Sequence, residues 1–308
     1  MISRRKFLKG VLAVSAGTAA LGGYAVAEPW RLNVTRYSLT PPGWPPGLNL
    51  RCAILADLHA CEPWMGDARI RQIVARTNAL APDVTLLLGD YVAGRQLAKY
   101  STEMPHAQWA TALAGLRAPL GVHAVLGNHD WWHDVEVQLR RHGPVPAGSA
   151  LEAVGIPVYE NAAVRLLKDG QPFWLAGLSD QLALWPRKGT ANYRTWRLEG
   201  LDDLPATLAQ VRDNAPVILM AHEPDIFPKV PGRVALTISG HTHGGQITLA
   251  GFAPYVPSRY GRRFAYGHIV EENRNLIVSG GLGCSGVPIR FGRPPEIVIV
   301  ELGGAPTA

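Results

Sequence analysis

Cysteine is scarce in this sequence of 308 residues, and its distribution excludes a disulfide-built fold. The three cysteines are Cys52, Cys61 and Cys284. Because their number is odd and no two are spaced as a CxxC pair, a disulfide framework is excluded and only a single bridge stays open. Cys52 lies in an apolar stretch that predicts a buried strand, where a cysteine serves as a small core residue.

Basic residues are in small excess outside residues 1–27, and this argues against nucleic-acid binding. The whole chain has a net charge of +6. Arg4, Arg5, Lys6 and Lys9 supply +4 of it, because the same segment contains no acid, so the remainder carries +2. Proteins that bind nucleic acid present a basic stripe or patch, and we therefore expect no nucleic-acid partner.

Internal repeats, low-complexity segments and linkers are absent after residue 47, which predicts one domain over residues 28–308. Apolar residues make up 47% of the sequence, enough to form a large core. The 33 glycines and 25 prolines favour many turns and short connections over a long helical bundle.

The first 27 residues have the features of an export signal. Ser3-Arg4-Arg5-Lys6-Phe7-Leu8-Lys9 precedes a mild apolar run from Val11 to Tyr24, and Ala25-Val26-Ala27 fits a small-residue cleavage site. The paired arginines resemble the twin-arginine signal. We expect transport by the twin-arginine machinery to the bacterial periplasm or the outer face of the cytoplasmic membrane, with residues 1–27 removed or kept as an anchor. An ordinary secretory signal is the alternative.

Apolar runs alternate with helical patterns along the rest of the chain. Strands are predicted over residues 32–39, 48–56, 84–88, 122–126, 162–167, 173–178, 217–221, 234–238, 276–278 and 297–300. Helices are predicted over residues 68–80, 104–116 and 204–212. This alternation is typical of α/β folds, in which sites form outside the carboxyl ends of strands.

Five predicted strands end in residues that can bind a metal or a phosphate. In chain order these residues are Asp57 and His59, Asp90, Asn128 and His129, His222, and His241 and His243. Each residue alone has an ordinary explanation in a turn or cap, but that explanation would have to hold at five strand ends together. Because imidazole is a common metal ligand, the pattern predicts a metal centre. The glycine-flanked turn Gly240–Gly245 would let its two imidazoles converge.

The order of these motifs resembles that of the calcineurin-like metallophosphoesterases over residues 50–302. The matching motifs are Asp57-Leu58-His59, Gly89-Asp90, Gly127-Asn128-His129-Asp130, His222 and Gly240-His241-Thr242-His243. Three further segments, Gly240–Ile247, Pro257–Arg263 and Pro288–Ile297, are similar to bacterial phosphodiesterases of the YkuE and YaeI type. The resemblance implies an α/β fold, a four-layered α/β/β/α sandwich with two mixed β-sheets flanked by helices.

By the resemblance, seven side chains hold two divalent metal ions, with one carboxylate between the ions. The first ion would be held by Asp57, His59 and His243, the second by Asn128, His222 and His241, with Asp90 as the bridge. His129 would be the catalytic residue and would bind no metal, and Asp130 would orient its ring. Mixed nitrogen and oxygen ligands suit Mn, Fe, Zn or Co.

The chemistry expected of such a site is phosphoric ester hydrolysis. Two divalent ions about 3.5–4 Å apart neutralise the charge of a phosphodiester and lower the pKa of a water between them toward ~7. The predicted reaction is an in-line attack by a metal-bridging hydroxide, with His129 stabilising the developing charge or protonating the leaving oxygen. The expected substrate is a lipid-linked or nucleotide-type phosphodiester or pyrophosphate. A metal-dependent nuclease and a catalytically silent metal-binding protein are the alternatives.

Two positions separate the chain from other branches that it resembles. Ala93 stands where protein Ser/Thr phosphatases have a second Asp and where purple acid phosphatases have an iron-binding Tyr. Gly94 stands where the Ser/Thr phosphatases have Arg. These departures disfavour assigning the chain to the protein Ser/Thr phosphatases or to the purple acid phosphatases.

Apolar residues near the motifs indicate what surrounds the site. Trp64, Trp131 and Trp132 lie within a few residues of motif positions, and predict either rim packing or an apolar entrance for a lipid or aromatic leaving group. Residues 182–188 are apolar and then basic, which fits contact with an anionic membrane lipid. Together, these residues predict an enzyme that contacts the membrane surface and acts on a membrane lipid.

Overall fold

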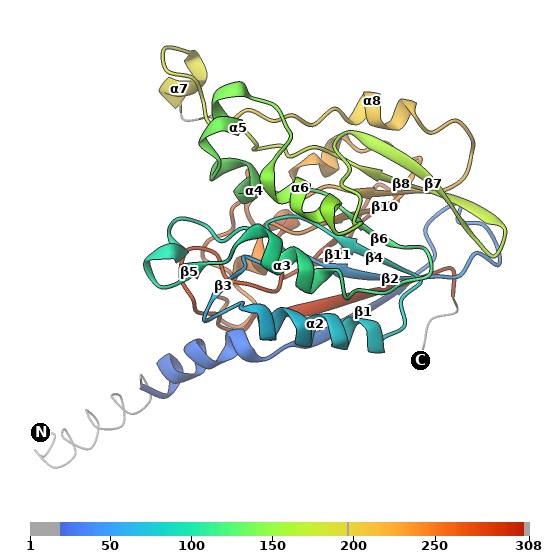
Figure 1. Cartoon of the computed structure of the whole chain (residues 1–308). Helices are drawn as coiled ribbons and strands as arrows, with labels where there is room; N and C mark the ends of the chain where they lie inside the picture. The colour runs from blue at the N-terminus through green and yellow to red at the C-terminus, as the bar shows by residue number, and fades with distance from the viewer. Residues whose placement is uncertain (1–18, 196, 305–308) are drawn as a thin grey trace, which may run out of the picture.

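Two β-sheets form the centre of the computed structural model, which describes residues 19–195 and 197–304 (Figure 1). The first sheet contains, in order, β1 (Asn33–Leu39), β13 (Glu296–Leu302), β2 (Leu50–Leu55), β4 (Val84–Leu87) and β6 (Val122–Ala124). The second contains β11 (Gly267–Glu271), β12 (Arg274–Val278), β10 (Val234–Ser239), β9 (Val217–Met220), β8 (Gln171–Gly177) and β7 (Ala162–Lys168). Both sheets mix parallel and antiparallel pairs. A small separate ribbon pairs β3 (Cys61–Glu62) with β5 (Thr102–Glu103).

Alternating side chains of the central strands divide the interior into separate cores. In β2, Ala53 and Leu55 join the core under the helices, whereas Cys52 and Ile54 join the core between the two sheets. Successive side chains of a strand point to opposite faces and both faces are covered, so every residue of β2 except the exposed Arg51 is buried and apolar. Cys52 is therefore a core residue, as predicted, and all three cysteines are buried and free.

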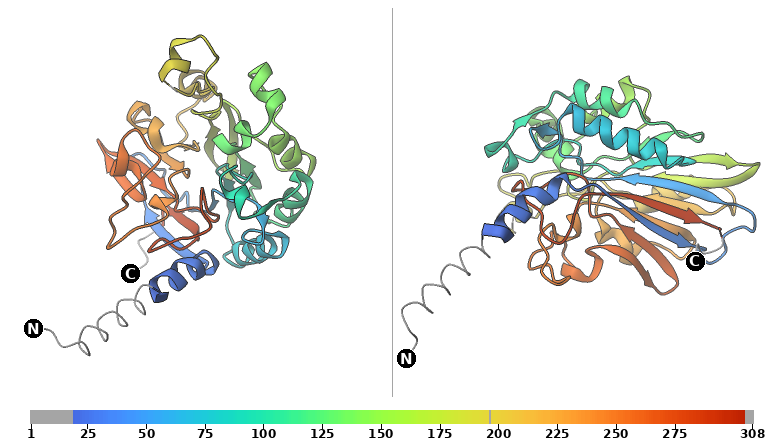
Figure 2. Two further views of the ribbon diagram at one scale, coloured as in Figure 1. Left: turned by 90° about the vertical axis from the view of Figure 1, so that its left-hand side faces the viewer. Right: turned by 90° about the horizontal axis from the view of Figure 1, so that it is seen from below.

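Helices cover the outer faces of both sheets and complete four layers (Figures 1 and 2). The first sheet is covered by α2 (Asp67–Ala79), α3 (His106–Leu113) and α6 (Pro146–Ala153). The second is covered by α8 (Leu204–Ala209) and the 3₁₀-helices η3 (Pro224–Lys229) and η5 (Gly261–Phe264). The predicted α/β/β/α sandwich is thus confirmed, with a thin fourth layer.

Six further helices in residues 28–195 and 197–304 have three to six residues each. They are η1 (Glu28–Trp30), η2 (Leu97–Lys99), α4 (Asn128–Trp132), α5 (Val135–Arg140), α7 (Ala191–Thr195) and η4 (His243–Gly245). The sequence pattern predicts ten strands and the longer helices to within a few residues. It does not predict the two-residue strands β3 and β5 or the short helix α7, and it also misses α4, α5, α6 and β11. These four elements have five to eight residues each, and a helical period needs a window of about 11–18 residues.

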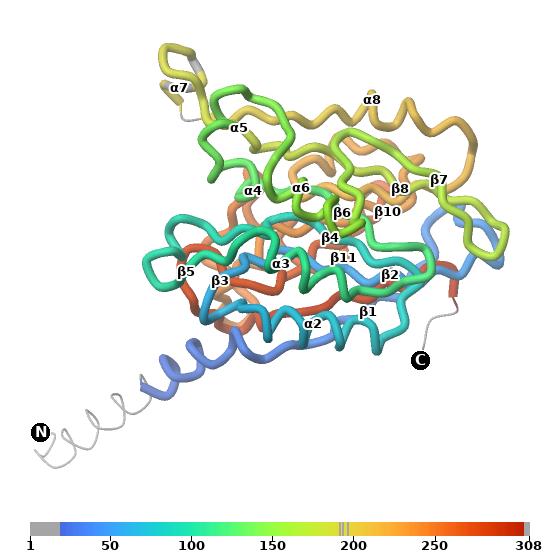
Figure 3. The backbone as a smooth tube through the Cα atoms, in the orientation of Figure 1, coloured from blue at the N-terminus to red at the C-terminus, as the bar shows by residue number. Residues whose placement is uncertain are grey.

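Residues 19–27 form a helix that leaves the body on the side where α4 and β3 lie (Figures 1 and 3). The ring of Tyr24 packs edge-on against Phe291, with centroids 5.2 Å apart. The backbone N–H of Arg290 donates to the carbonyl of Ala25 over 3.1 Å. The twin-arginine motif lies outside the described residues. No helix in the described part of the chain is both long and apolar enough to cross a membrane.

Candidate metal centre

The predicted ligands meet at one edge of the two sheets. Strands β2, β4 and β6 run parallel to one another, and β9 runs parallel to β10. Each of these five strands is followed by one of the predicted motifs, and the carboxyl ends of parallel strands lie at the same edge of a sheet. Figure 2 (left) looks onto this edge. Six of the seven predicted ligands form two groups, within each of which the ligand atoms lie within 4.8 Å of one another.

The first group consists of Asp57, His59 and His243, and all three residues are buried. The Nε2 atoms of the two histidines are 3.0 Å apart. The Nε2 atom of His243 is 3.7 Å from Oδ1 of Asp57. One nitrogen from each ring and a carboxylate oxygen therefore converge, as a mixed metal site requires.

The second group consists of Asp90, His222 and His241, and Asn128 lies against it. Oδ2 of Asp90 is 3.2 Å from Nε2 of His222, and Nδ1 of His241 is 2.8 Å from Oδ1 of Asn128. The same Oδ2 of Asp90 is 3.7 Å from Nε2 of His59 in the first group. Asp90 thus lies between the groups, where a bridging carboxylate would have to be.

Two buried atoms of these groups have no hydrogen-bond partner in the described part of the chain, namely Oδ2 of Asp57 and Nε2 of His222. A buried polar atom without a partner is costly, and a metal ion would satisfy it. The tautomer of His222 fits, because its Nδ1 lies 2.6 Å from the carbonyl oxygen of Leu88 and so donates its proton there. His59 makes the equivalent contact with Val92, over 3.0 Å. In His59 this leaves the Nε2 lone pair for a metal. Burial lowers the pKa of His222, but the neighbouring carboxylates, Asp90 first, outweigh burial and raise this pKa well above its usual value, so a metal there would take the place of the Nε2 proton.

Backbone strain is concentrated in the candidate ligands. Five of them have a left-handed backbone, with φ of 54° at Asp57, 47° at His59, 55° at Asp90, 67° at His241 and 51° at His243. Residues with a Cβ atom adopt this conformation at a cost of about 1–2 kcal/mol each. Strain of this kind is typical of functional sites. In the Gly240–Gly245 turn, His241 and His243 adopt positive φ as well as the glycines Gly244 and Gly245. The two histidines belong to different ligand groups.

Burial keeps most of the imidazoles uncharged. It lowers the pKa of His59, His241 and His243, and the neighbouring His59 and the Arg290 guanidinium lower that of His243 further. A neutral imidazole is the form that binds a metal. Burial also raises the pKa of Asp90, but the imidazoles around it, His222 first, outweigh burial and bring this pKa well below its usual value. The bridging position thus holds a carboxylate.

His129 lies beside both groups but is a member of neither. Its backbone N–H donates to Oδ1 of Asp90 over 2.8 Å, which holds the first turn of α4 against the centre. Its Nδ1 lies 3.1 Å from Nε2 of His133, and the two rings are stacked. Burial lowers the pKa of His129 to about 3, so this ring is neutral near pH 7. His133 is a contact that the motifs did not predict, although its i+4 spacing from His129 is the signal for it.

Asp130 does not orient the ring of His129, and that prediction was wrong. Its carboxylate oxygens accept hydrogen bonds of 2.8–3.0 Å from the backbone N–H groups of Asp90, Tyr91, Val92 and Gly127. Four donors on one buried carboxylate fix the loop after β4 against the start of α4. Asp130 therefore holds the backbone of Asp90 and of Gly127, the residue before Asn128, whereas His133 contacts the ring of His129.

A cavity of about 640 Å³ opens onto the two groups and contains His129 in its wall. Its apolar lining comes mainly from Trp132, Trp185, Ile247, Tyr255 and Val287. Of the three predicted tryptophans, only Trp132 lines this cavity. Trp131 is buried in the core under the helices, because successive residues of α4 point in different directions. Trp64 packs against Trp30, with ring centroids 5.9 Å apart.

Residues 50–245 match the family model of the calcineurin-like phosphoesterases. The chain is 29% identical over 309 residues to the metallophosphoesterase YkuE of Bacillus subtilis (strain 168), with 98% of each chain covered. It is 28% identical over 309 residues to the phosphodiesterase YaeI of Escherichia coli (strain K12), covering 98% of this chain and 100% of YaeI. Among solved structures, a dimetal phosphatase from Danio rerio gives a TM-score of 0.44 at 12% identity, covering 76% of this chain and 88% of that chain. The family match spans most of the sequence, and the chain therefore belongs to the calcineurin-like phosphoesterases and is a metal-dependent phosphoesterase.

Proposed function

We propose that the chain hydrolyses a phosphodiester or pyrophosphate with two divalent ions, Mn, Fe, Zn or Co. The ligands would be Asp57, His59 and His243 for one ion and Asn128, His222 and His241 for the other, with Asp90 between them. The observation that carries the proposal is the pair of unpartnered buried atoms, Oδ2 of Asp57 and Nε2 of His222, one in each group. Each atom needs a partner, and an ion beside each would provide it.

When bound, two divalent ions would neutralise the charge of the phosphate and supply a hydroxide near pH 7 for in-line hydrolysis. Asp90 lies between the two ligand groups and would hold both of them beside the phosphate. His129 lies in the cavity wall, and its contact with His133 through Nδ1 leaves Nε2 for the substrate. From there the neutral ring of His129 would donate a hydrogen bond from Nε2 to the phosphate oxygens as charge develops on them. Protonation of the leaving oxygen, the other role expected of His129, is disfavoured because burial lowers its pKa to about 3.

Hydrolysis of bis-p-nitrophenyl phosphate tests this proposal directly. We expect the Mn²⁺-loaded chain to release p-nitrophenolate, a chelator to remove both metal and activity, and added Mn²⁺ to restore both. Metal content, measured by mass spectrometry before and after chelation, should return to two ions per chain. A chain that binds two ions and hydrolyses no phosphodiester would instead be a catalytically silent metal-binding protein.

The surface around the cavity supports a substrate at the membrane. The segment after the Gly240–Gly245 turn carries Leu249 and Phe252, which pair across an antiparallel bridge and are 71% and 52% exposed. The guanidinium of Arg262 lies 4.2 Å from the ring centre of Phe252. Exposed apolar side chains beside cations are typical of proteins that contact anionic lipid headgroups. We therefore propose that this segment touches the membrane and that the substrate is an amphiphilic phosphate ester.

Flotation with vesicles tests the membrane contact, using the chain without residues 1–27. We expect binding to phosphatidylglycerol vesicles, and an affinity at least about tenfold lower for L249E/F252E, because two apolar side chains lose their burial in the interface. The matched control is L167E/V270E, since Leu167 and Val270 are also more than half exposed, at 52% and 56%, and line neither of the cavities beside the centre. A wild-type chain that stays with the soluble fraction, or a control that loses as much affinity, would rule out this contact.

We further propose export by the twin-arginine route, based on the Ser3–Lys9 motif. The helix of residues 19–27 leaves the body on the side of the metal centre (Figures 1 and 2), so a retained segment would keep the centre near the membrane. Replacing Arg4 and Arg5 with lysine should trap the chain in the cytoplasm, as cell fractionation would reveal. Undiminished export of that variant would point to an ordinary secretory signal.

A further inference from the structure

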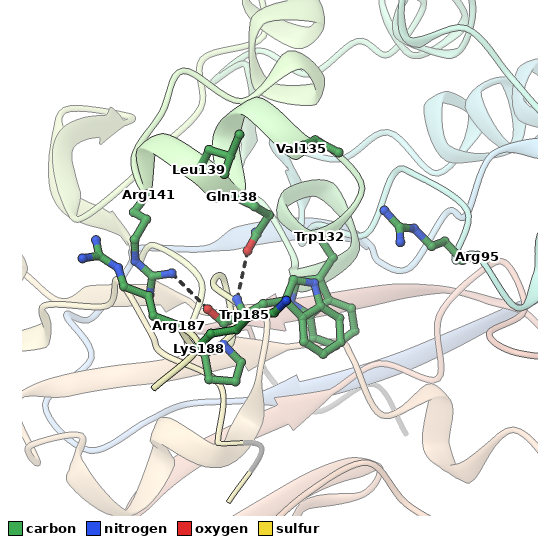
Figure 4. Close-up of a pocket in the computed structure, with 10 residues that line it drawn as sticks. Arg95, Trp132, Val135, Gln138, Leu139, Arg141, Trp185, Arg187 and Lys188 are labelled. Carbon is green, nitrogen blue, oxygen red and sulfur yellow. Dashed lines mark hydrogen bonds between the residues drawn. The ribbon is translucent and has the colours of Figure 1, made fainter. Parts of the chain in front are cut away.

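A second cavity of about 480 Å³ adjoins the cavity of the metal centre (Figure 4). Arg95, Trp132 and Trp185 line both cavities, so the two spaces meet at the tryptophan pair. No candidate metal ligand lines the second cavity. The chemistry proposed for the centre therefore gives this space no role, although its volume is that of a small-ligand site.

Trp132 and Trp185 form a fixed platform between the cavities. Their ring centroids are 4.8 Å apart, and the indole N–H of Trp132 donates to the carbonyl of Leu182 over 2.7 Å. The backbone of Trp185 is held from α5 at two points, by Oε1 of Gln138 at 2.9 Å and by Nη1 of Arg141 at 3.0 Å (Figure 4). Trp185 is nevertheless 42% exposed. A rigid aromatic surface open to solvent can bind a flat or apolar group with little loss of conformational freedom.

Unpaired cations flank this platform. The second cavity is lined by four cationic residues, Arg95, Arg141, Arg187 and Lys188, and by no acidic residue. Arg141 is neutralised by an ion pair with Glu199. The side chains of Arg95, Arg187 and Lys188 have no hydrogen bond or ion pair within residues 19–195 and 197–304, and they are exposed. In Figure 4, Arg95 lies on one side of the tryptophan pair, and Arg187 and Lys188 lie on the other.

From this arrangement we infer that the second cavity is a subsite for the part of the substrate that is remote from the scissile phosphate. It takes an aromatic or apolar spacer on Trp132 and Trp185, followed by a second phosphate that Arg187 and Lys188 bind. Guanidinium and ammonium groups bind phosphate through charge-assisted hydrogen bonds, and an acid-free lining leaves these cations available. The inference rests on the proposed function, because it assumes that the first phosphate lies at the metal centre.

Binding of aryl phosphonates tests the subsite without requiring turnover. The probes are phenylene and biphenyl diphosphonates, each compared with its monophosphonate by calorimetry on the Mn²⁺-loaded full chain. We expect at least one diphosphonate to bind about 10–100-fold more tightly than its monophosphonate, as a charge-assisted contact would give. The variant R187A/K188A should lose this preference while its affinity for the monophosphonate stays the same.

The control variant is R76A/R212A, which removes two exposed cations far from the cavity in sequence and leaves the net charge equal to that of R187A/K188A. It should keep the full preference for the diphosphonate. The subsite is overturned if wild type shows no preference, if both double variants lose it alike, or if R187A/K188A retains it. Failure of bis-p-nitrophenyl phosphate hydrolysis would instead count against the proposed function, since the binding comparison needs no catalysis.

A bilayer headgroup is the other source of a phosphate for Arg187 and Lys188. Flotation of R187A/K188A with phosphatidylglycerol vesicles separates the two sources. We expect R187A/K188A to bind the vesicles as tightly as wild type does, although it has lost the preference for the diphosphonate. Lost vesicle binding with an intact preference would assign these residues to the membrane surface and overturn the subsite.

Discussion

Replacing His129 with alanine is expected to lower the turnover of bis-p-nitrophenyl phosphate about 10²–10⁴-fold and to leave two metal ions bound. This loss is typical for a group that acts on a proton or a developing charge in the transition state. The metal should stay because His129 belongs to neither ligand group. Its backbone N–H, which the substitution keeps, is what contacts Asp90.

Metal content and kcat, measured on the same preparation, decide this prediction. His142 provides the matched control, because it is an exposed histidine that lines neither cavity, and H142A should match wild type in both quantities. G94A offers an independent perturbation, since a Cβ at Gly94 would lie 2.7 Å from Cε1 of His129 and press on the ring. It should lower kcat without lowering metal content. Equal loss of metal and turnover in H129A would make His129 a ligand rather than a catalytic residue.

Asp90→Asn is expected to reduce bound metal below two ions per chain and to lower turnover about 10³-fold. The magnitude corresponds to several kcal/mol of transition-state charge stabilisation by the metal pair. Asparagine keeps an oxygen that can accept from the backbone N–H of His129, so the start of α4 should stay in place. What disappears is the negative charge beside His59 and His222, at 3.7 and 3.2 Å.

Titration with Mn²⁺ under equilibrium dialysis measures the change in occupancy. A higher Mn²⁺ concentration should partly restore the activity of D90N, since the remaining ligands are untouched. D169N serves as the control, because the Asp169 side chain is 81% exposed and far from the centre in sequence. Two tightly bound ions in D90N would show that Asp90 does not bridge the groups.

The sequence by itself determined ten of the strands, all except β3, β5 and β11, and which polar residues follow five of them. The stretches 84–88, 217–221 and 234–238 are buried at every position and are apolar except for Thr85 and Thr237, because their strands are covered on both faces. Their carboxyl ends had to meet, since parallel strands end at one edge. The ligand residues and His129 could therefore be named from their positions after strands, and the family resemblance assigned them to two ions.

Only the tertiary structure decided how these residues are held. Asp130 accepts from four backbone N–H groups of two loops that lie about forty residues apart in sequence, and no local pattern encodes such a contact. The left-handed φ angles of the ligands are likewise imposed by packing, against the intrinsic preference of residues with a Cβ. Tertiary packing also requires a glycine at position 127, because a Cβ there would lie 2.4 Å from Oδ1 of Asp90.

The surroundings of the centre also depended on the tertiary structure. Gln138 of α5 and Arg141, the residue after α5, bind the backbone of Trp185, whose ring lies beside Trp132. Neither α5 nor these contacts have a periodic signal in so short a segment. Trp131 and Trp132 are neighbours in sequence, yet one is buried in the core and the other lines the cavity. Local patterns report which residues end a strand, whereas long-range packing decides which side chains meet, and that is why the sequence predicts the ligands and the structure reveals their support.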